Sequence, residues 1–320
     1  MKWAAAPGAQ PIIFQRDSAG HQRGGMAMKR VLFIFNPYAG KEKIKGSLAG
    51  IIDVFNKGGY EVVTYASQYP MHVKELVSQL GEMYDLIVCS GGDGTLNEAV
   101  TGLMQLEKRP CLGYIPAGST NDFAASIGLP KDMIRCAKKI VSGKPFLCDI
   151  GRFRQRYFTY VAAFGAFTEV PYITSQQSKN VLGHQAYVLE AVKQMNSIKS
   201  YHMMIRYENH VLEDDFLFGM VSNATSIAGF RGLPGKDVEL NDGRFEVMLV
   251  RDTKNPLDFP AILTSIFLRN PDPKFVYTFK ASAIEMTSPQ SVNWVLDGEF
   301  GGNCTSVDIE IDHKAISIML

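Results

Sequence analysis

The sequence predicts an α/β domain with a doubly wound, mostly parallel sheet, followed by a mainly antiparallel β-sandwich domain. Two observations support this fold class. Short apolar runs alternate with amphipathic helical patterns from residue 31 to about residue 141, as in repeated β-α units. Beyond about residue 147, strand-like runs follow one another at short separations, which favours antiparallel pairing.

Four apolar runs rich in branched side chains predict the strands of the first domain, and the helical patterns between them predict its helices. The expected strands are Val31–Phe35, Glu61–Tyr65, Asp85–Cys89 and Leu112–Ile115. The expected helices carry their apolar positions from Ile44 to Phe55, Val73 to Leu80, Leu96 to Met104 and Met133 to Val141. In a sheet of this kind, ligands bind beyond the carboxyl ends of the strands.

The second domain is predicted to consist mostly of strands. Two hairpins are expected, Phe146–Phe153 with Tyr157–Phe164, and Tyr201–Tyr207 with Val211–Ser222. Further strands are predicted at Phe245–Val250, Phe275–Ala281, Ala283–Thr287, Ser306–Ile311 and Ala315–Leu320, and helices at 183–198 and 257–268. The apolar stripe of the 257–268 helix fits a core face better than a membrane-facing one.

Changes along the chain place the domain boundaries. Residues 1–28 lack the apolar run of a secretory signal and carry scattered Gly, Pro, Gln and Arg, so we expect a disordered extension. The α/β domain is expected to cover residues 29–147, and the β-rich domain residues 148–311. The extreme C-terminus, about 312–320, is expected to pack back on the first domain.

Composition and charge narrow the class of protein. The 320 residues are 46% hydrophobic and 20% charged, enough to bury the cores of two domains. The formal net charge of +1 and the lack of a basic cluster argue against a nucleic-acid partner. Five scattered cysteines have neither disulfide nor zinc spacing and suit a reducing interior. No apolar run reaches the roughly 18 residues of a membrane span, so we expect a cytoplasmic protein, at most peripheral to a membrane.

A glycine-rich segment directly follows the third predicted strand. Gly91, Gly92 and Gly94 fall at a strand-to-helix turn, where free N–H groups and the helix dipole favour an anion. Asp93 would repel a phosphate unless it acts through Mg²⁺, which prefers oxygen ligands. The segment therefore predicts a nucleotide site for phosphoryl transfer, with Gly91, Gly92, Asp93, Gly94, Thr95, Leu96 and Asn97 as its residues. The structural alternative is a tight turn in which Asp93 only caps the helix.

Three other segments should end at the same sheet edge. The expected nucleotide contacts from two of them are Asn36, Pro37, Gly40, Lys41 and Ser67. The third segment follows the fourth strand and contributes Ser119, a small hydroxyl suited to phosphate or ribose. Lys41 fits a solvated lysine at the start of a helix equally well. Asn121 and Asp122 fit a helix cap as well as a functional site.

Taken together these segments resemble the diacylglycerol kinase catalytic domain. The resemblance rests on Gly91–Thr95, on Asn36-Pro37 with Gly40, and on Ile115-Pro116 with Gly118 and Asn121-Asp122-Phe123. It continues through Asp242-Gly243-Arg244-Phe245-Glu246-Val247 and Leu296-Asp297-Gly298-Glu299. The resemblance therefore covers residues 29 to 320. Within the family, the sequence is most similar to the soluble bacterial lipid kinases. It implies the fold shared with NAD kinases and phosphofructokinases.

The resemblance also implies roles for two acidic segments. A hydroxyl attacking a γ-phosphate needs a base, for which Asp297 and Glu299 are the candidates, and Gly298 favours a turn that points them into a cleft. In similar proteins the glutamate accepts the proton and the aspartate supports the site. A second, structural Mg²⁺ is implied at Asp242, with backbone carbonyls of Glu239 and Arg244, although Arg244 departs from the usual apolar residue and Asn241 from a common acid.

The leading prediction is an ATP- and Mg²⁺-dependent lipid kinase that phosphorylates a neutral lipid alcohol, above all diacylglycerol, giving phosphatidic acid. Asp93, Asp297 and Glu299 would form its catalytic group. Such a protein would contact a membrane surface transiently, and the sequence leaves open a homodimer. The alternatives are an NAD kinase, which shares the acidic glycine turn, and a nucleotide-binding regulator that has lost catalysis. Segments 118–123 and 297–299 argue against an NAD kinase.

Overall fold

Four parallel strands form the sheet of the first domain. The structure, a computed structural model, describes residues 28–166, 199–233, 237–255 and 258–320. The strands lie in the order β2 (Tyr60–Ala66), β1 (Lys29–Phe35), β3 (Leu86–Gly91) and β4 (Cys111–Pro116). All three pairings are parallel, as the β-α alternation predicts. The predicted helix 183–198 and nearly all of the predicted extension lie outside the described residues.

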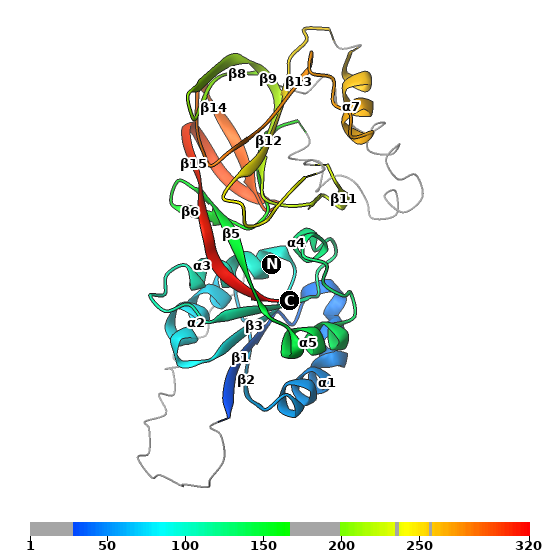
Figure 1. Cartoon of the computed structure of the whole chain (residues 1–320), viewed down its shortest axis with the longest axis vertical. Helices are drawn as coiled ribbons and strands as arrows, with labels where there is room; N and C mark the ends of the chain where they lie inside the picture. The colour runs from blue at the N-terminus through cyan, green and yellow to red at the C-terminus, as the bar shows by residue number, and fades with distance from the viewer. Residues whose placement is uncertain (1–27, 167–198, 234–236, 256–257) are drawn as a thin grey trace.

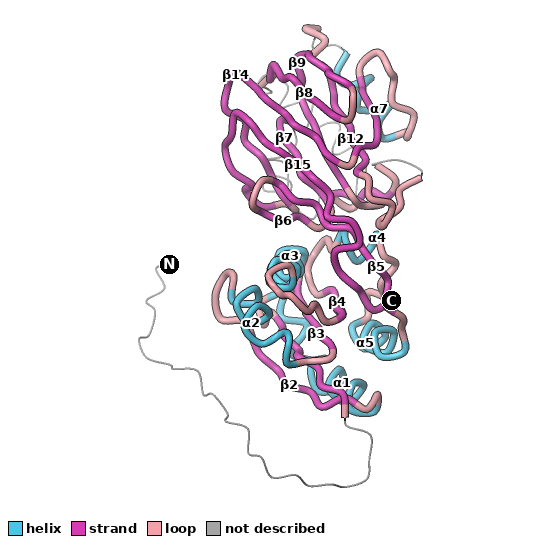
Figure 2. The backbone as a smooth tube through the Cα atoms, turned by 60° about the vertical axis from the view of Figure 1, so that its left-hand side comes forward, coloured by secondary structure: helices cyan, strands magenta, loops and turns pink. Residues whose placement is uncertain are grey.

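Helices cover both faces of this sheet, as Figure 2 shows. On one face α1 (Lys43–Lys57) packs against α5 (Met133–Ser142), and Ile51 and Phe55 are buried beside Ala137. On the other face α2 (His72–Leu80) packs against α3 (Asp93–Leu103). Apolar residues at helical spacing therefore cover both faces of the sheet, which confirms the doubly wound arrangement. Short helical segments complete the domain at Ala39–Glu42, Gly81–Met83 and α4 (Asp122–Ser126).

The second domain is a rolled, largely antiparallel set of strands above the first (Figure 1). Its elements are β5 (Pro145–Phe153), β6 (Arg156–Phe158), β7 (Val161–Gly165), β8 (Tyr201–Tyr207), β9 (His210–Ser222), β10 (Ser226–Ile227), β11 (Phe230–Arg231), β12 (Phe245–Arg251), α7 (Phe259–Phe267), β13 (Val276–Ala281), β14 (Ala283–Leu296) and β15 (Glu299–Met319). Trp294 lies at its centre, with ring centroids 5.0 Å from those of both Phe153 and Phe164. The predicted fold class is confirmed.

One predicted strand is wrong. The run from Tyr157 to Phe164 is divided between β6, which pairs with β5, and β7, which pairs with β9 and β14. The break falls at Thr159 and Tyr160, whose N–H groups donate to the carboxylate of Asp297 instead of to a neighbouring strand. A distant side chain therefore ends a strand that local alternation would continue.

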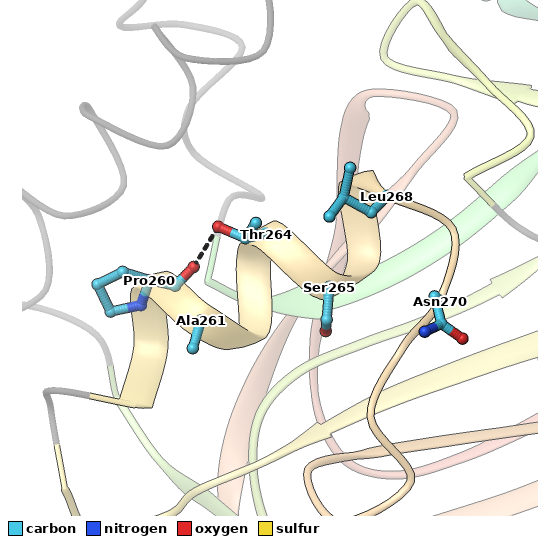
Figure 3. Close-up of a pocket in the computed structure, with 6 residues that line it drawn as sticks. All are labelled: Pro260, Ala261, Thr264, Ser265, Leu268 and Asn270. Atoms are coloured by element: carbon cyan, nitrogen blue, oxygen red, sulfur yellow. Dashed lines mark hydrogen bonds between the residues drawn. The ribbon is translucent and has the colours of Figure 1, made fainter.

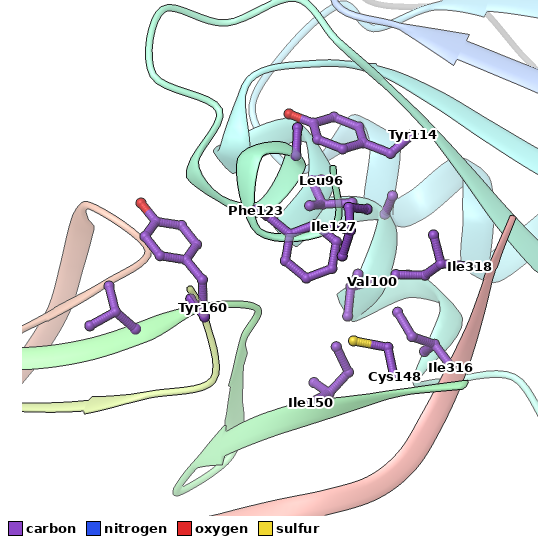
Figure 4. Packing of buried hydrophobic residues seen from close by; sticks show 14 of the residues in the cluster. Leu96, Val100, Tyr114, Phe123, Ile127, Cys148, Ile150, Tyr160, Ile316 and Ile318 are labelled. Carbon is purple, nitrogen blue, oxygen red and sulfur yellow. The ribbon is translucent and has the colours of Figure 1, made fainter. Parts of the chain in front are cut away.

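Two strands cross from the second domain to the first. The predicted runs Ser306–Ile311 and Ala315–Leu320 form one strand, β15, whose pairing with β5 shifts register between Asp312 and Ile316. Beyond the shift, Ile318 pairs in parallel with Leu112 of β4. Figure 4 shows Ile316 and Ile318 packed in the core with residues of the α/β domain. The predicted boundary at 147/148 falls inside β5 and stays a prediction.

Helix α7 presents its apolar face to the second domain. Phe259, Ile262, Leu263 and Ile266 are buried, which confirms the core-face prediction for this helix. Its outer face, with Pro260, Thr264 and the exposed Leu268, lines a hollow of about 440 Å³ (Figure 3). No helix in the described ranges is long and apolar enough to cross a membrane.

Candidate active site

The glycine turn between β3 and α3 forms an anion cradle. Gly92 takes the N-cap position of α3 in an extended conformation, and no side chain caps the helix. The first N–H groups of α3 are therefore left for a ligand, at the positive end of the helix dipole. A side chain on Gly91 would begin 2.2 Å from Oγ1 of Thr95, so this turn has no room for one.

Two further loops close against this turn. Asn36, after β1, donates its N–H to the Ser90 carbonyl at 2.9 Å. Gly40 has a φ of +55°, and a Cβ there would lie 1.7 Å from the Ala117 carbonyl oxygen. A Cβ on Gly118 would lie 2.6 Å from Cα of Gly92. Backbone therefore packs directly on backbone, because glycine has no side chain to separate the loops.

The three loops line one cleft of about 530 Å³ at the carboxyl ends of the strands. The structure brings eight predicted site residues together there: Asn36, Gly40, Ser67, Gly92, Gly94, Thr95, Ser119 and Glu299. The cleft is also lined by residues outside the predicted set: Tyr38, Ala39, Gln68, Tyr69, Pro70, Val73, Glu98 and Gly118.

The other predicted contacts lie beside or beneath the cleft. Leu96 is fully buried, and Gly91 packs under Thr95. Lys41 belongs to the 3-10 helix Ala39–Glu42 at the cleft edge, directly after Gly40. Pro37 follows Asn36 without lining the cavity. Asn97 faces the second domain, where its Nδ2 donates to the Tyr157 carbonyl at 3.0 Å and to Asp297 at 2.8 Å.

Glu299 comes to the cleft from the second domain. Asp297 and Gly298, with φ of +50° and +84°, form the two-residue turn that joins β14 to β15. Positive φ at both positions is typical of a type I′ hairpin, for which Asp-Gly is a preferred sequence. Leu296 pairs with Glu299 across this turn, and Oε1 of Glu299 lies 2.7 Å from where a side chain on Gly94 would begin.

Five hydrogen-bond donors surround the carboxylate of Asp297. This buried carboxylate accepts from the N–H groups of Thr159, Tyr160 and Val161 at 2.6, 3.0 and 3.1 Å. The Thr159 hydroxyl and the Asn97 amide add two donors, both at 2.8 Å. Five donors satisfy the lone pairs of the carboxylate, so Asp297 fixes the turn that carries Glu299.

Asp93 lies where helices α3 and α4 begin. Within the described part of the chain, its carboxylate accepts only long bonds, from the N–H groups of Asp122 at 3.3 Å and Phe123 at 3.5 Å. Burial, together with the negative charges of Asp122 and Asp297, raises its pKa from 3.8 to about 7. A partly buried carboxylate with weak donors and two acidic neighbours is a group that a divalent cation would stabilise, so Asp93 fits the predicted Mg²⁺.

Asn121 and Asp122 brace the loops around the cleft. The Asn121 side chain makes no cap bond to α4; its Oδ1 accepts from the Gly118 N–H at 2.9 Å, and its Nδ2 donates to the Gly118 carbonyl at 2.8 Å. Asp122 is buried and accepts from the Ser226 hydroxyl at 2.9 Å and the Gly229 N–H at 2.8 Å. Asn121 therefore shapes the Gly118 loop, and Asp122 ties the two domains together.

Glu98 is an acidic residue of the cleft that the motifs do not include. Its carboxylate accepts from the N–H groups of Met71 at 2.9 Å and Val73 at 3.1 Å, at the start of α2. Burial raises its pKa, and the nearby Glu299 adds to this. The sequence carried a signal for it, because Glu98 is four residues after Gly94 and so lies on the same face of α3.

The residues predicted for a structural Mg²⁺ do not fit one here. Oδ1 of Asp242 accepts from the Arg244 N–H at 3.0 Å, and Oδ2 lies 3.1 Å from Nζ of Lys280. Both carboxylate oxygens are therefore engaged. Within the described ranges, no three His, Cys, Asp or Glu side chains are grouped to hold a metal ion. A role for the backbone of Glu239 stays a prediction.

Comparisons with known proteins identify the family. The diacylglycerol kinase catalytic domain matches residues 30–153. A diacylglycerol kinase of Bacillus subtilis (strain 168) is 34% identical over 280 residues, which cover 86% of this chain and 91% of that protein. A diacylglycerol kinase of Staphylococcus aureus (strain bovine RF122 / ET3-1) is 34% identical over 277 residues, which cover 86% and 87%.

Solved structures show the same fold over nearly the whole chain. A crystal structure of a diacylglycerol kinase from Bacillus anthracis str. Sterne aligns with a TM-score of 0.71 at 21% identity, covering 91% of this chain and 96% of that one. A second crystal structure from the same strain has a TM-score of 0.76 at 23% identity, with the same coverage. The chain therefore belongs to the diacylglycerol kinase family and is a phosphotransferase with an alcohol acceptor.

Proposed function

We propose that this protein is an ATP- and Mg²⁺-dependent lipid kinase that transfers the γ-phosphate to the hydroxyl of diacylglycerol and so forms phosphatidic acid. The observation that carries the proposal is the approach of Glu299 to Gly94. It places an exposed carboxylate from the β-rich domain against the uncapped start of α3. A base and an anion cradle thus face each other across one cleft.

The α/β domain would hold the nucleotide. Phosphate oxygens would accept from the free N–H groups at Gly92–Thr95, and the hydroxyls of Ser67 and Ser119 line the same cleft. Asp93 would hold Mg²⁺, which when bound offsets the charge of the phosphates. The negative group at Asp93 would then face a cation, which favours its ionised form.

Glu299 would accept the proton of the attacking hydroxyl. Its backbone is held by the Asp297-Gly298 turn, which places the exposed side chain at the cleft. A carboxylate in this position can form the hydrogen bond that a general base requires. Asp297 would contribute by fixing the turn, and Asn97 by joining α3 to that turn.

The acceptor proposal draws on the relatives. The curated relatives at 34% identity are named diacylglycerol kinases, and they match this chain over both domains. A two-chain lipid has negligible solubility in water, so the protein would contact a membrane surface transiently during turnover. We propose that this protein is cytoplasmic and is peripheral to the membrane during turnover.

An assay of labelled phosphate transfer tests the proposal directly. The purified protein would receive γ-labelled ATP with Mg²⁺ and, in separate reactions, dispersed diacylglycerol, monoacylglycerol, a sphingoid base, phosphatidylglycerol or NAD. We expect the highest rate with diacylglycerol and no transfer in the presence of EDTA. Transfer to NAD but to none of the lipids would refute a lipid kinase, and a higher rate with another lipid would change the acceptor.

The variant Glu299→Gln tests the proposed base. Loss of the carboxylate should lower kcat by roughly 10²- to 10⁴-fold with nearly unchanged ATP binding, as expected for removal of a general base. Glu285→Gln is the matched control, because Glu285 lies on neighbouring β14 and pairs with Arg206 at the surface. Equal turnover in the two variants would remove Glu299 from the mechanism.

A further inference from the structure

The ammonium group of Lys280 lies among three oxygens beside the Asp242-Gly243 turn. Its Nζ donates to the Asp237 carbonyl at 2.8 Å and lies 3.1 Å from Oδ2 of Asp242 and 3.1 Å from Oε1 of Glu246. The contacts with Asp237 and Asp242 are hydrogen bonds, and the contact with Glu246 is an ion pair. Lys280 therefore sits as a cation at the turn where the family resemblance implies a metal.

Strand pairing fixes this position. Lys280 on β13 stands directly opposite Glu246 on β12 in the antiparallel register. Side chains at directly opposed positions lie on the same face of the sheet and contact each other. The position of the ammonium group is therefore set by the pairing of β12 with β13 and does not depend on a flexible loop.

Within the described part of the chain, the carboxylates of Asp242 and Glu246 have no cationic partner other than Lys280. Glu246 is buried, and Lys280 is the cation paired with it. Arg244, the nearest arginine in sequence, is engaged by Glu208. A buried carboxylate without a compensating charge is costly, so Lys280 supplies what this turn requires.

We propose that the Lys280 ammonium takes the place of a divalent cation at the Asp242 turn, so that the second domain folds without a structural metal. Mg²⁺ demands near-octahedral oxygen coordination at short distance, whereas here one carboxylate oxygen accepts from the Arg244 N–H and the other faces the ammonium. A divalent ion at Asp242 would also share that carboxylate with a second cation and be repelled by it.

The site matters because the turn braces the junction between the domains. The Gly243 N–H donates to Oδ2 of Asp149 at 2.7 Å, and the Lys314 N–H donates to Oδ1 of the same residue at 2.6 Å. Asp149 is fully buried on β5, and Lys314 lies at the register shift of β15. Lys280 therefore stabilises a turn that contacts both strands crossing between the domains.

The test measures thermal unfolding of the nucleotide-free protein, so it does not depend on kinase activity. We expect Mg²⁺ to change the Tm of wild type and of Asp242→Asn by the same amount relative to EDTA, since an ion bound at Asp93 is common to both. Lys280→Met should lower the Tm in EDTA by roughly 5 °C. Mg²⁺ should restore part of that loss, because the two carboxylates then become available to a metal. Lys57→Met is the control, since Lys57 forms an exposed ion pair with Asp53 on α1.

Two results would overturn the proposal. One is a Mg²⁺-dependent rise in the wild-type Tm that Asp242→Asn abolishes, since a metal would then occupy the turn beside Lys280. The other is a Lys280→Met protein with the same Tm as wild type and the Lys57→Met control. If Lys280→Met does not fold, the Mg²⁺-dependent change in Tm of wild type and of Asp242→Asn still decides whether a metal occupies the turn. A change in Tm that persists in Asp242→Asn locates the ion elsewhere and supports the proposal.

Discussion

The β-rich domain contains two Asp-Gly turns that hold their aspartates in different ways. Asp297 is surrounded by five hydrogen-bond donors and fixes Glu299 at the cleft. Asp242 faces one N–H group and the ammonium group of Lys280, and its turn braces the junction between domains. The same dipeptide thus serves two purposes, because the neighbours that fold against it decide how its negative charge is stabilised.

The largest effect is expected from Asp297→Asn. An amide NH₂ in place of either oxygen would face N–H or O–H donors, so at least two hydrogen bonds would be lost around a buried group. We expect a loss of about 3 kcal/mol in unfolding free energy and a fall in kcat. Urea unfolding measures the first. Asp308→Asn, at an exposed position on β15, is the control; equal stability of the two would contradict the positioning role.

Gly94→Ala should separate catalysis from stability. The new methyl group would meet Oε1 of Glu299, the end of an exposed and flexible side chain, so the carboxylate can move aside without disturbing the core. Displacement of the proposed base by about 1 Å should lower kcat by about 10²-fold with a small change in Tm. Steady-state kinetics beside thermal unfolding would show this, and unchanged kcat would argue that Glu299 does not act from its position beside Gly94.

Asp242→Asn should have a smaller effect than Asp297→Asn. Its carboxylate has fewer partners, and its ion pair with Lys280 is partly exposed to solvent. We expect a loss of about 1 kcal/mol in unfolding free energy, because screening weakens the ion pair. Urea unfolding of both variants under one set of conditions tests the contrast between the turns. Equal losses of unfolding free energy in Asp242→Asn and Asp297→Asn would contradict that contrast.

The remaining prediction concerns the pH dependence of stability. The pKa of Asp93 is raised from 3.8 to about 7 in the folded, nucleotide-free protein. Folding therefore favours the protonated carboxyl, so its contribution to stability is present below pH 4 and is lost as the pH rises through about 7. Asp93→Asn should make unfolding free energy less dependent on pH in this window. Glu246, with a pKa raised to about 7 by burial, leaves some dependence in the variant. Identical pH profiles would show that Asp93 is not perturbed.

Much of the fold followed from local pattern. The order of strands and helices up to residue 142 agrees with the periodicity of apolar residues, because each element of a β-α unit buries one continuous face or stripe. The second domain was less predictable. The division of Tyr157–Phe164 into β6 and β7 depends on Asp297, which is more than a hundred residues away in sequence. The local sequence of the run does not predict this break.

The candidate site divides in the same way. The glycine turn and the Asp297-Gly298 hairpin were predictable, since tight turns demand particular residues. Asn97 could not be placed from its motif, because only its contacts with Tyr157 and Asp297 show that it faces the second domain. The cleft aromatics Tyr38 and Tyr69 likewise had no sequence signal that separated them from other surface tyrosines.

The sequence by itself determined the two-domain fold class, the glycine turn and the acidic hairpin, because backbone conformation and hydrophobic periodicity are local properties. Only the tertiary structure decided which charge meets which. It brought Glu299 to Gly94 across 205 positions of sequence, gave Asp297 its five donors and placed Lys280 at the Asp242 turn. Electrostatic and hydrogen-bond partners act through space over a few ångströms, and no spacing along the chain specifies them.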